Sequence, residues 1–198
     1  MQLHPFHPAC GPGFRKIAEA DLPSRFGHFR VFGFEFRRAA RELEEAIALK
    51  MGDLCADPPL VYIHSECLAG DVFDSLRCDC RSQIETAMAT IAEEGRGLVI
   101  YRNRTGRGFA TWQPLRPVTS GWAAAQVGCE VIHRRGAAVG STSTLPIGIL
   151  HFFGLACVRL LAEAEDGRFL RAHGIEIANE PLPATASHPS PFYGGMKL

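Results

Sequence analysis

The sequence lacks an excess of charge of either sign, since its 198 residues include 21 lysines and arginines and 21 aspartates and glutamates. No global field therefore favours nucleic acid or an anionic membrane as a partner. The sequence also lacks an apolar run long enough to cross a bilayer, because the longest run, residues 145–155, is interrupted by Pro146 and His151. The first ten residues lack the charged start and the apolar core of a signal peptide. We therefore expect a cytoplasmic protein that binds neither nucleic acid nor membranes.

The sequence does contain many cysteines for its length, and their number is odd. An odd number in a chain of this size argues against a disulfide scaffold, and clustered cysteines in a cytosolic protein indicate a metal site or catalysis instead. The seven are Cys10, Cys55, Cys67, Cys78, Cys80, Cys129 and Cys157.

The composition is that of an ordinary globular protein, with 46% hydrophobic and 21% charged residues, and the length suits one compact domain. We predict a loose lead-in over residues 1–13, one domain over residues 14–180 and an extended tail over residues 181–198. Strand patterns and helix patterns alternate along the chain, and this alternation predicts an α/β or α+β fold.

Short apolar runs bounded by turn residues predict the strands, and runs of strong helix formers predict the helices. The predicted strands are residues 27–36, 60–64, 97–101, 157–161 and 175–177. The predicted helices are residues 83–94, 121–127, 145–154 and 169–173. Loops are predicted over residues 102–108 and 135–144.

Two local features qualify this assignment. Ser82 is a candidate N-cap for the helix over residues 83–94, with Glu85 three residues later as in a capping box. Residues 37–50 consist of strong helix formers, but the second part, residues 46–54, could equally be a strand, and the pattern alone leaves both open.

The most informative cysteines are Cys67, Cys78 and Cys80, spaced Cys-x10-Cys-x-Cys. Three thiolates suit zinc, and two cysteines one residue apart in an extended or turn segment can both reach one ion. Three protein ligands leave the fourth position open for water, whose pKa a zinc ion lowers toward neutrality. This spacing therefore predicts a catalytic zinc site.

Two other interpretations of the same cysteines remain open. The thiols could be core residues that bind no metal. Alternatively, a fourth protein ligand would close the coordination sphere and make the zinc structural. The candidates for that fourth ligand are Cys55, His64 and His133.

Residues 64–101, HSECLAGDVFDSLRCDCRSQIETAMATIAEEGRGLVIY, resemble the zinc-site region of GTP cyclohydrolase II, an enzyme family of riboflavin biosynthesis. The family pattern is close to HSECLTGD…SLRCDC…QL, followed by a helix, IAEEGRG and a strand. Residues 17–35 also resemble the start of the family's sequence, and weaker similarity is found over residues 106–110, 152–161 and 170–177.

The resemblance implies a fold, an assembly and a reaction. The fold would be the family's single domain, a mixed sheet flanked by helices, in which residues 46–54 form a strand. The active form would be a homodimer with Cys67, Cys78 and Cys80 as zinc ligands. The family reaction opens the imidazole ring of GTP, releases formate and removes pyrophosphate. Mg²⁺ assists at the phosphates, so we expect it here only if the substrate is a nucleoside polyphosphate.

The sequence departs from the family where the family contacts the nucleotide. Tyr62 stands where a basic residue contacts phosphate, and Thr105 replaces a glutamate. Residues 136–146 lack the family's aspartate and arginine, and residues 162–167, AEAEDG, replace a TNNPxK segment that meets guanine and phosphate. Carboxylates there would repel a triphosphate. These departures predict a changed substrate, such as a less phosphorylated purine or pyrimidine or another cyclic amide or amidine.

Six further residues are candidate site residues. Glu66 and His64 are candidate catalytic residues, because each could move a proton beside the metal. Gln83, Arg107, Tyr62 and Thr105 are candidate substrate-binding residues. The competing interpretations are a surface carboxylate for Glu66, a core histidine for His64 and a solvated loop for Arg107.

The sequence thus predicts a zinc-dependent hydrolase that opens a nitrogen heterocycle and takes a small heterocyclic or nucleotide substrate. Two alternatives stand beside it. One is an orthodox GTP cyclohydrolase II that forms the riboflavin precursor. The other is a non-catalytic binding protein with a structural zinc.

Overall fold

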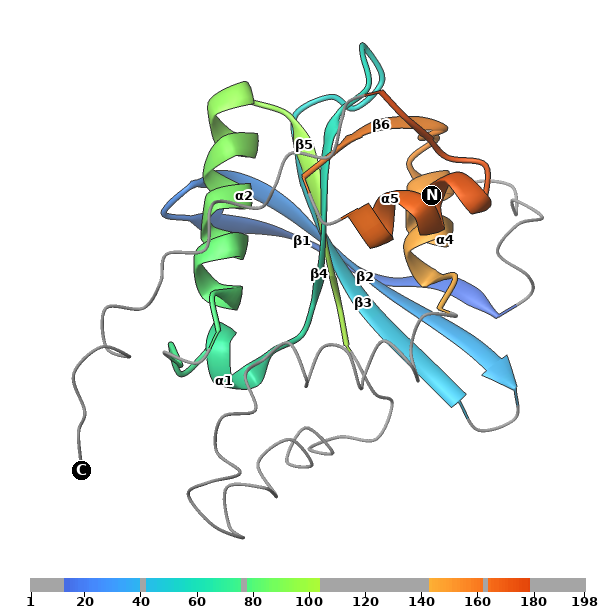
Figure 1. Ribbon diagram of the computed structural model, residues 1–198, viewed down its shortest axis with the longest axis horizontal. Helices are drawn as coiled ribbons and strands as arrows, with labels where there is room; N and C mark the ends of the chain where they lie inside the picture. Colours follow the sequence, from blue (N-terminus) through green and yellow to red (C-terminus); the bar gives the residue numbers. More distant parts are fainter. Residues whose placement is uncertain (1–12, 40–41, 76–77, 104–142, 162–163, 179–198) are drawn as a thin grey trace, which may run out of the picture.

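The computed structural model of the chain describes residues 13–39, 42–75, 78–103, 143–161 and 164–178 (Figure 1). These residues form one seven-stranded mixed sheet in the order β1-β2-β3-β5-β4-β6-β7, with helices on both of its faces. The predicted mixed sheet flanked by helices is therefore confirmed. No helix in these ranges is long and apolar enough to cross a membrane.

The sheet has an antiparallel part and a parallel part. The antiparallel part consists of β1 (Phe14–Ser24), β2 (Gly27–Ala39), β3 (Glu42–Met51) and β5 (Gly97–Arg102). The parallel part joins β5 to β4 (Leu60–Ser65), β6 (Cys157–Leu160) and β7 (Glu176–Ile177). Because β4 lies between two parallel neighbours and is covered on both faces, its sequence is a nearly continuous apolar run.

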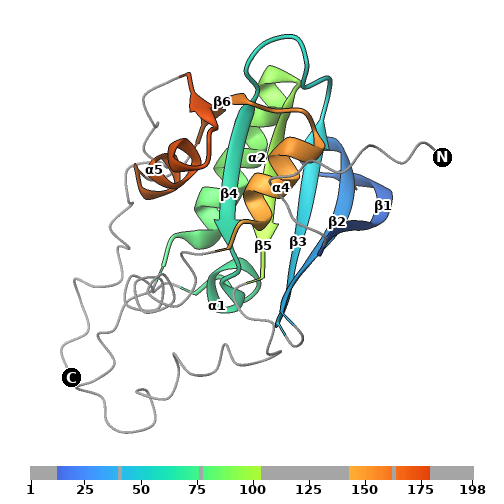
Figure 2. The same cartoon turned by 90° about the vertical axis from the view of Figure 1, so that its right-hand side faces the viewer.

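The helices lie on opposite faces of β4 and β5, as Figure 2 shows, with α4 in front of the strands and α2 behind them. They are α1 (Leu68–Asp71), α2 (Cys80–Glu94), α4 (Leu145–Phe152) and α5 (Ala164–Ala172). Side chains of a strand alternate between its two faces. Accordingly Leu60 and Tyr62 of β4 pack with Ile91 of α2, whereas Val61 and Ile63 belong to the cluster that contains α4.

This alternation decides where the polar end of β4 lies. Continuing the series Leu60, Tyr62 places His64 on the face that α2 covers. In the parallel ladder, His64 is paired with Tyr101 at the end of β5. Two polar rings are thus brought together at the carboxyl ends of adjacent parallel strands, where α/β folds commonly bind ligands.

The helix considered for residues 37–50 is wrong. Residues 42–51 form β3, which pairs with β2 on one side and β5 on the other. Ala46 and Ala48 are buried in the core on one face, while Ile47 between them is exposed. Pairing with two distant strands and burial of alternate residues outweigh the local helix preference of these residues. The strand implied by the family resemblance is confirmed over residues 46–51.

The predicted N-cap at Ser82 is also wrong, because α2 begins at Cys80 and Asp79 occupies the N-cap position. Glu85 does not close a capping box, since its carboxylate accepts a hydrogen bond from Arg81 and pairs with Arg25. The predicted end of this helix is confirmed at Gly95, which adopts a left-handed conformation.

The remaining predictions are partly confirmed. The strands over residues 27–36, 60–64, 97–101 and 157–161 and the helix that starts at Leu145 are present, and α5 begins five residues earlier than predicted. β1 was not predicted as a strand. The predicted lead-in, tail and helix over residues 121–127 lie outside the described residues, as does most of the two predicted loops.

Candidate metal centre

The three cysteines of the predicted zinc site lie together at the end of β4, where the chain enters α1. Their Sγ atoms all lie within 4.8 Å of one another. Cys67 occupies the N-cap position of α1, Cys80 is the first residue of α2, and Cys78 precedes it by two residues. Cys67 and Cys80 are buried and Cys78 is half-buried. The starts of two helices therefore bring the sulfurs to one point.

The arrangement of these sulfurs fits a zinc ion. Tetrahedral zinc with Zn–S bonds of about 2.3 Å places two sulfur ligands about 3.8 Å apart. The Sγ atoms of Cys67 and Cys78 are 3.8 Å apart. Gly70 makes this approach possible, because a Cβ atom there would lie 2.6 Å from the Cys78 sulfur and 2.9 Å from the Cβ of Cys80. The backbone of α1 thus leaves room beside the sulfurs that a side chain would fill.

A buried carboxylate, Asp71, lies beside the cysteines at the end of α1. Its Oδ1 accepts a hydrogen bond from His64 Nε2 at 2.9 Å. Its Oδ2 accepts two more, from the backbone N–H of Cys67 and from the hydroxyl of Tyr101, each at 2.8 Å. The Asp71 side chain is only 8% exposed. Both oxygens of this carboxylate therefore accept hydrogen bonds from protein groups.

The ring of His64 contacts protein groups through its face and through both of its nitrogens. It stacks on Tyr101 with ring centroids 5.3 Å apart, and its Nδ1 lies 3.0 Å from the Tyr62 hydroxyl. His64 is only 3% exposed. Burial raises the pKa of Tyr101 well above its usual range, and the hydrogen bond to Asp71 raises it further. Tyr101 therefore remains a hydrogen-bond donor over the physiological pH range.

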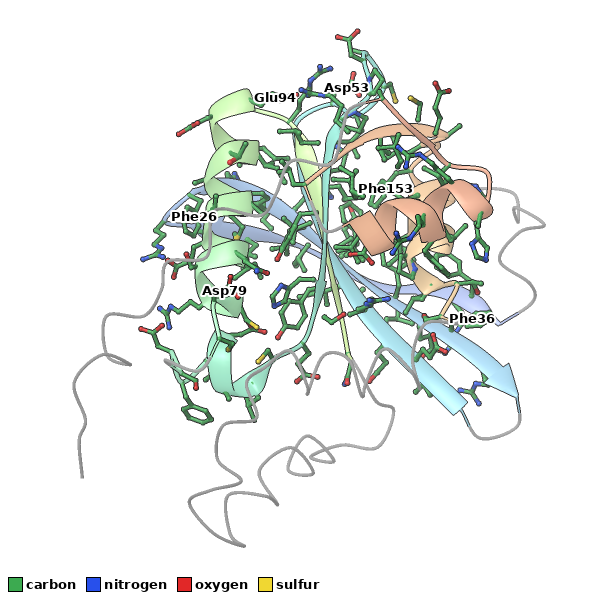
Figure 3. The ribbon with its side chains drawn as sticks, in the orientation of Figure 1. Phe26, Phe36, Asp53, Asp79, Glu94 and Phe153 are labelled. Carbon is green, nitrogen blue, oxygen red and sulfur yellow. The ribbon has the colours of Figure 1, made fainter. Side chains whose placement is uncertain are left out.

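Tyr62 connects the histidine to the start of α2. Its hydroxyl donates to Gln83 Oε1 at 3.4 Å, and Gln83 Nε2 donates to Asp79 Oδ2 at 2.9 Å. Figure 3 shows Asp79 at the end of α2 that lies beside α1. Burial raises the pKa of Tyr62 above its usual range, and the negative charges of Cys80 and Asp71 add to this effect. Tyr62 is thus a neutral, buried residue that contacts both His64 and Gln83.

Glu66 and Arg102 lie at the end of the two parallel strands. Glu66 precedes the first cysteine, is half-buried, and donates its backbone N–H to the Arg102 carbonyl at 3.0 Å. Arg102 Nε donates to Ser65 Oγ at 2.8 Å, and its guanidinium lies 3.9 Å from Asp166 of α5. The charge of Arg102 is therefore partly offset by a neighbouring carboxylate.

The structure brings together most of the candidate site residues. Among the described residues, the sulfur cluster contains the three predicted cysteines, while Cys55 is exposed elsewhere and His64 bonds to Tyr62 and Asp71. The predicted substrate-binding residues Arg107 and Thr105, and the alternative ligand His133, lie outside the described residues.

Sequence reasoning missed Asp71, Gly70 and Tyr101. A signal for Asp71 was present, because it follows Cys67 by four residues and so returns to the same side of one helical turn. Gly70 and Tyr101 could be found only from the packing of α1 against α2 and from the pairing of β4 with β5.

Known proteins resemble this chain in sequence. GTP cyclohydrolase-2 of Histophilus somni is 48% identical over 101 residues, which is 50% of this chain and 45% of that protein. The riboflavin biosynthesis protein RibBA of Salinispora tropica is 52% identical over 102 residues, 50% of this chain and 25% of that protein. The chain therefore spans less than half the length of these curated relatives.

A solved structure and a family model complete the comparison. RibBX, a two-domain 3,4-dihydroxy-2-butanone 4-phosphate synthase from A. baumannii, is 10% identical with a TM-score of 0.42, covering 78% of this chain and 36% of that one. A likeness that weak does not bear on the assignment. The model of the family GTP cyclohydrolase II matches residues 15–181, which is well over half of the sequence. The chain belongs to the GTP cyclohydrolase II family.

Proposed function

We propose that this protein is a zinc-dependent hydrolase that opens a nitrogen heterocycle, either a purine, a pyrimidine or a related cyclic amide or amidine. The observation that carries the proposal is the cluster of three sulfurs at zinc-compatible spacing. It lies within the segment that matches a family of ring-opening hydrolases. Cys67, Cys78 and Cys80 would hold the metal and leave its fourth position open.

In this proposal the metal and the protein have separate tasks. Zinc, when bound, would act as a Lewis acid toward the attacking water and toward the oxygen that becomes negative. Glu66 takes a proton from the attacking water and returns it to the leaving ring nitrogen. In the part of the chain that the structure describes, no hydrogen bond or ion pair engages the Glu66 carboxylate, and the residue adjoins Cys67. His64 holds its neighbours in place, because both of its ring nitrogens face protein groups.

The substrate in this proposal carries less negative charge than GTP. Tyr62, where the family pattern has a basic residue, is neutral and buried. Arg102 faces the carboxylate of Asp166, which belongs to the AEAEDG segment. Neither residue offers the unpaired positive charge that a triphosphate requires. Gln83, at the start of α2, and the loop with Thr105 and Arg107 would contact the heterocycle. Mg²⁺ takes part only if the substrate is a nucleoside polyphosphate.

An orthodox GTP cyclohydrolase II is the second candidate, because the two curated relatives are named as a GTP cyclohydrolase-2 and as a riboflavin biosynthesis protein. We further propose a cytoplasmic homodimer, as the family resemblance implies. Val72 and Phe73, which follow α1, are 58% and 71% exposed, and a partner subunit would shield them.

Turnover assays separate these functions. The zinc-loaded protein is incubated with guanosine, GMP, GDP and GTP, and with the corresponding pyrimidine compounds, with and without Mg²⁺. Formate, pyrophosphate and loss of the heterocycle's absorbance are followed, with Cys80→Ser as the matched control. We expect ring opening of a compound with no or one phosphate, and none with Cys80→Ser. GTP as the preferred substrate would contradict the altered specificity, and full zinc without turnover would support a non-catalytic protein.

A further inference from the structure

One continuous series of polar contacts links the two segments that carry the cysteines. It begins at the backbone N–H of Cys67 and ends at Asp79, which lies between Cys78 and Cys80. Its members in order are Cys67, Asp71, His64, Tyr62, Gln83 and Asp79. We call this chain of residues the polar belt. The belt joins α1 to α2 through β4.

Asp71 is the strongest link of the polar belt. A buried carboxylate is costly unless hydrogen bonds compensate it, and bonds to a charged acceptor are stronger than bonds between neutral groups. Asp71 accepts three of them, from Cys67, His64 and Tyr101. One of these fixes the backbone of a cysteine directly. Losing the Asp71 charge would therefore loosen the start of α1, where Cys67 lies.

The geometry also defines the hydrogen position on His64. A carboxylate only accepts hydrogen bonds, so the contact with Asp71 requires a hydrogen on His64 Nε2. The single hydroxyl hydrogen of Tyr62 then faces two acceptors, His64 Nδ1 at 3.0 Å and Gln83 Oε1 at 3.4 Å, and the contact with His64 is the shorter one. His64 is thus a rigid connector whose two nitrogens have opposite roles, and Tyr62 is the donor that sets one of them.

We propose that Asp71 and Tyr62 are positioning residues that set the zinc affinity and the ligand geometry of the three cysteines. They act by holding Cys67 at a fixed distance from the segment of Cys78 and Cys80. Groups that orient metal ligands from behind typically change metal affinity about 10–100-fold when they are altered. This inference rests on the proposed function only in requiring that the cysteines bind zinc.

The test compares zinc binding by the wild type, Asp71→Asn and Tyr62→Phe. Asp71→Asn keeps the side-chain shape but loses the charge, and Tyr62→Phe removes only the hydroxyl. Asp74→Asn is the matched control, because Asp74 is exposed on the same segment and its positive φ of 51° suits asparagine. Zinc dissociation constants are measured by competition with a chromophoric chelator, and the absorption bands of the Co²⁺-substituted proteins report ligand geometry.

We expect about 10–100-fold weaker zinc binding and shifted Co²⁺ bands for both belt variants, with the control unchanged. Unchanged affinity and spectra in a folded Asp71→Asn protein would overturn the inference. If that variant does not fold, Tyr62→Phe decides in the same way, since it leaves the packing in place. A wild type that binds no zinc would overturn the proposed function together with this inference. A zinc-binding wild type with unaltered variants overturns the inference alone.

Discussion

At the scale of single residues, the space beside the metal centre depends on a residue without a side chain. Gly70 lies where α1 meets the start of α2, and a Cβ atom there would be 2.6 Å from the Cys78 sulfur. Such a contact is not tolerated, so either the sulfur or the helix would have to move. The position therefore couples the backbone of α1 to the geometry of the cysteines.

We predict that Gly70→Ala weakens zinc binding by about tenfold or more, as changes beside metal ligands do. The measurement is a competition titration with a chromophoric chelator. Gly33→Ala is the control, because its Cβ would meet Ala18 and Ile17 at 3.3 Å but would not touch the cysteines. The same zinc affinity for Gly70→Ala as for Gly33→Ala would contradict the packing argument.

A second prediction concerns Glu66. If its carboxylate transfers the proton, Glu66→Gln should lower kcat by about 10²–10⁴-fold on the substrate that the turnover assays identify. Zinc content should not change, because Glu66 is not a proposed ligand. Glu93→Gln, an exposed position on α2, should retain activity. A Glu66→Gln enzyme with wild-type kcat would assign the proton transfer to another group.

The sequence predicted the cysteines of the candidate site better than it predicted the polar groups around them. Cysteine spacing and local resemblance singled out Cys67, Cys78 and Cys80, whose sulfurs the structure brings together. Their role as zinc ligands remains a prediction. The groups around them were harder to predict, because Tyr101 reaches Asp71 only through the pairing of β4 with β5. Contacts that depend on strand register are not visible in a local motif.

At the scale of elements, α2 positions the site because its first residue is Cys80 and its apolar face is fixed to the sheet. Ile91 is fully buried and packs in the cluster with Leu60 and Tyr62 of β4. The backbone of Gly97 at the start of β5 also approaches Ile91, leaving no room for a Cβ atom. The orientation of α2, and with it the position of Cys80, depends on this packing.

We predict that Ile91→Ala lowers the free energy of unfolding by about 2–5 kcal/mol, the usual cost of removing a large buried side chain. Chemical denaturation of the zinc-loaded protein measures it. Glu93→Ala on the exposed side of α2 should stay within about 0.5 kcal/mol of the wild type. Equal losses in both variants would mean that this face of α2 is not part of the core.

Helices and strands could be predicted where the local sequence pattern agrees with the tertiary packing. The prediction failed where the pattern and the packing favour different structures. β4, β5 and α4 followed from their apolar runs, since these segments are buried wherever the fold places them. β3 was ambiguous because its residues favour a helix locally and become a strand only between two partners. β1 gave no clear pattern, because most of its residues are exposed at the edge of the sheet.

At the scale of the whole molecule, zinc binding should be linked to stability, because the cysteine cluster ties β4, α1 and α2 together. A ligand at 100 times its dissociation constant stabilises the folded state by about 2.7 kcal/mol if it does not bind the unfolded chain. For a protein of this length, that corresponds to a Tm change of about 5–10 °C.

We therefore predict that a chelator lowers the Tm by about 5–10 °C and that added zinc restores it. Differential scanning calorimetry measures both steps. The double variant Cys67→Ser, Cys80→Ser should have a Tm that does not respond to chelator or zinc. A wild-type Tm that is insensitive to both would show that no metal is coupled to this fold.

The central claim is that Cys67, Cys78 and Cys80 bind one zinc ion, and the zinc content of purified protein tests it most directly. Elemental analysis is made on the wild type, Cys67→Ser, Cys80→Ser and the control Cys157→Ser, whose half-buried thiol on β6 is outside the cluster. We predict one zinc per chain in the wild type and in Cys157→Ser, and loss of zinc from the other two variants. Full zinc occupancy in both Cys67→Ser and Cys80→Ser, or none in the wild type after zinc is added, would contradict the account.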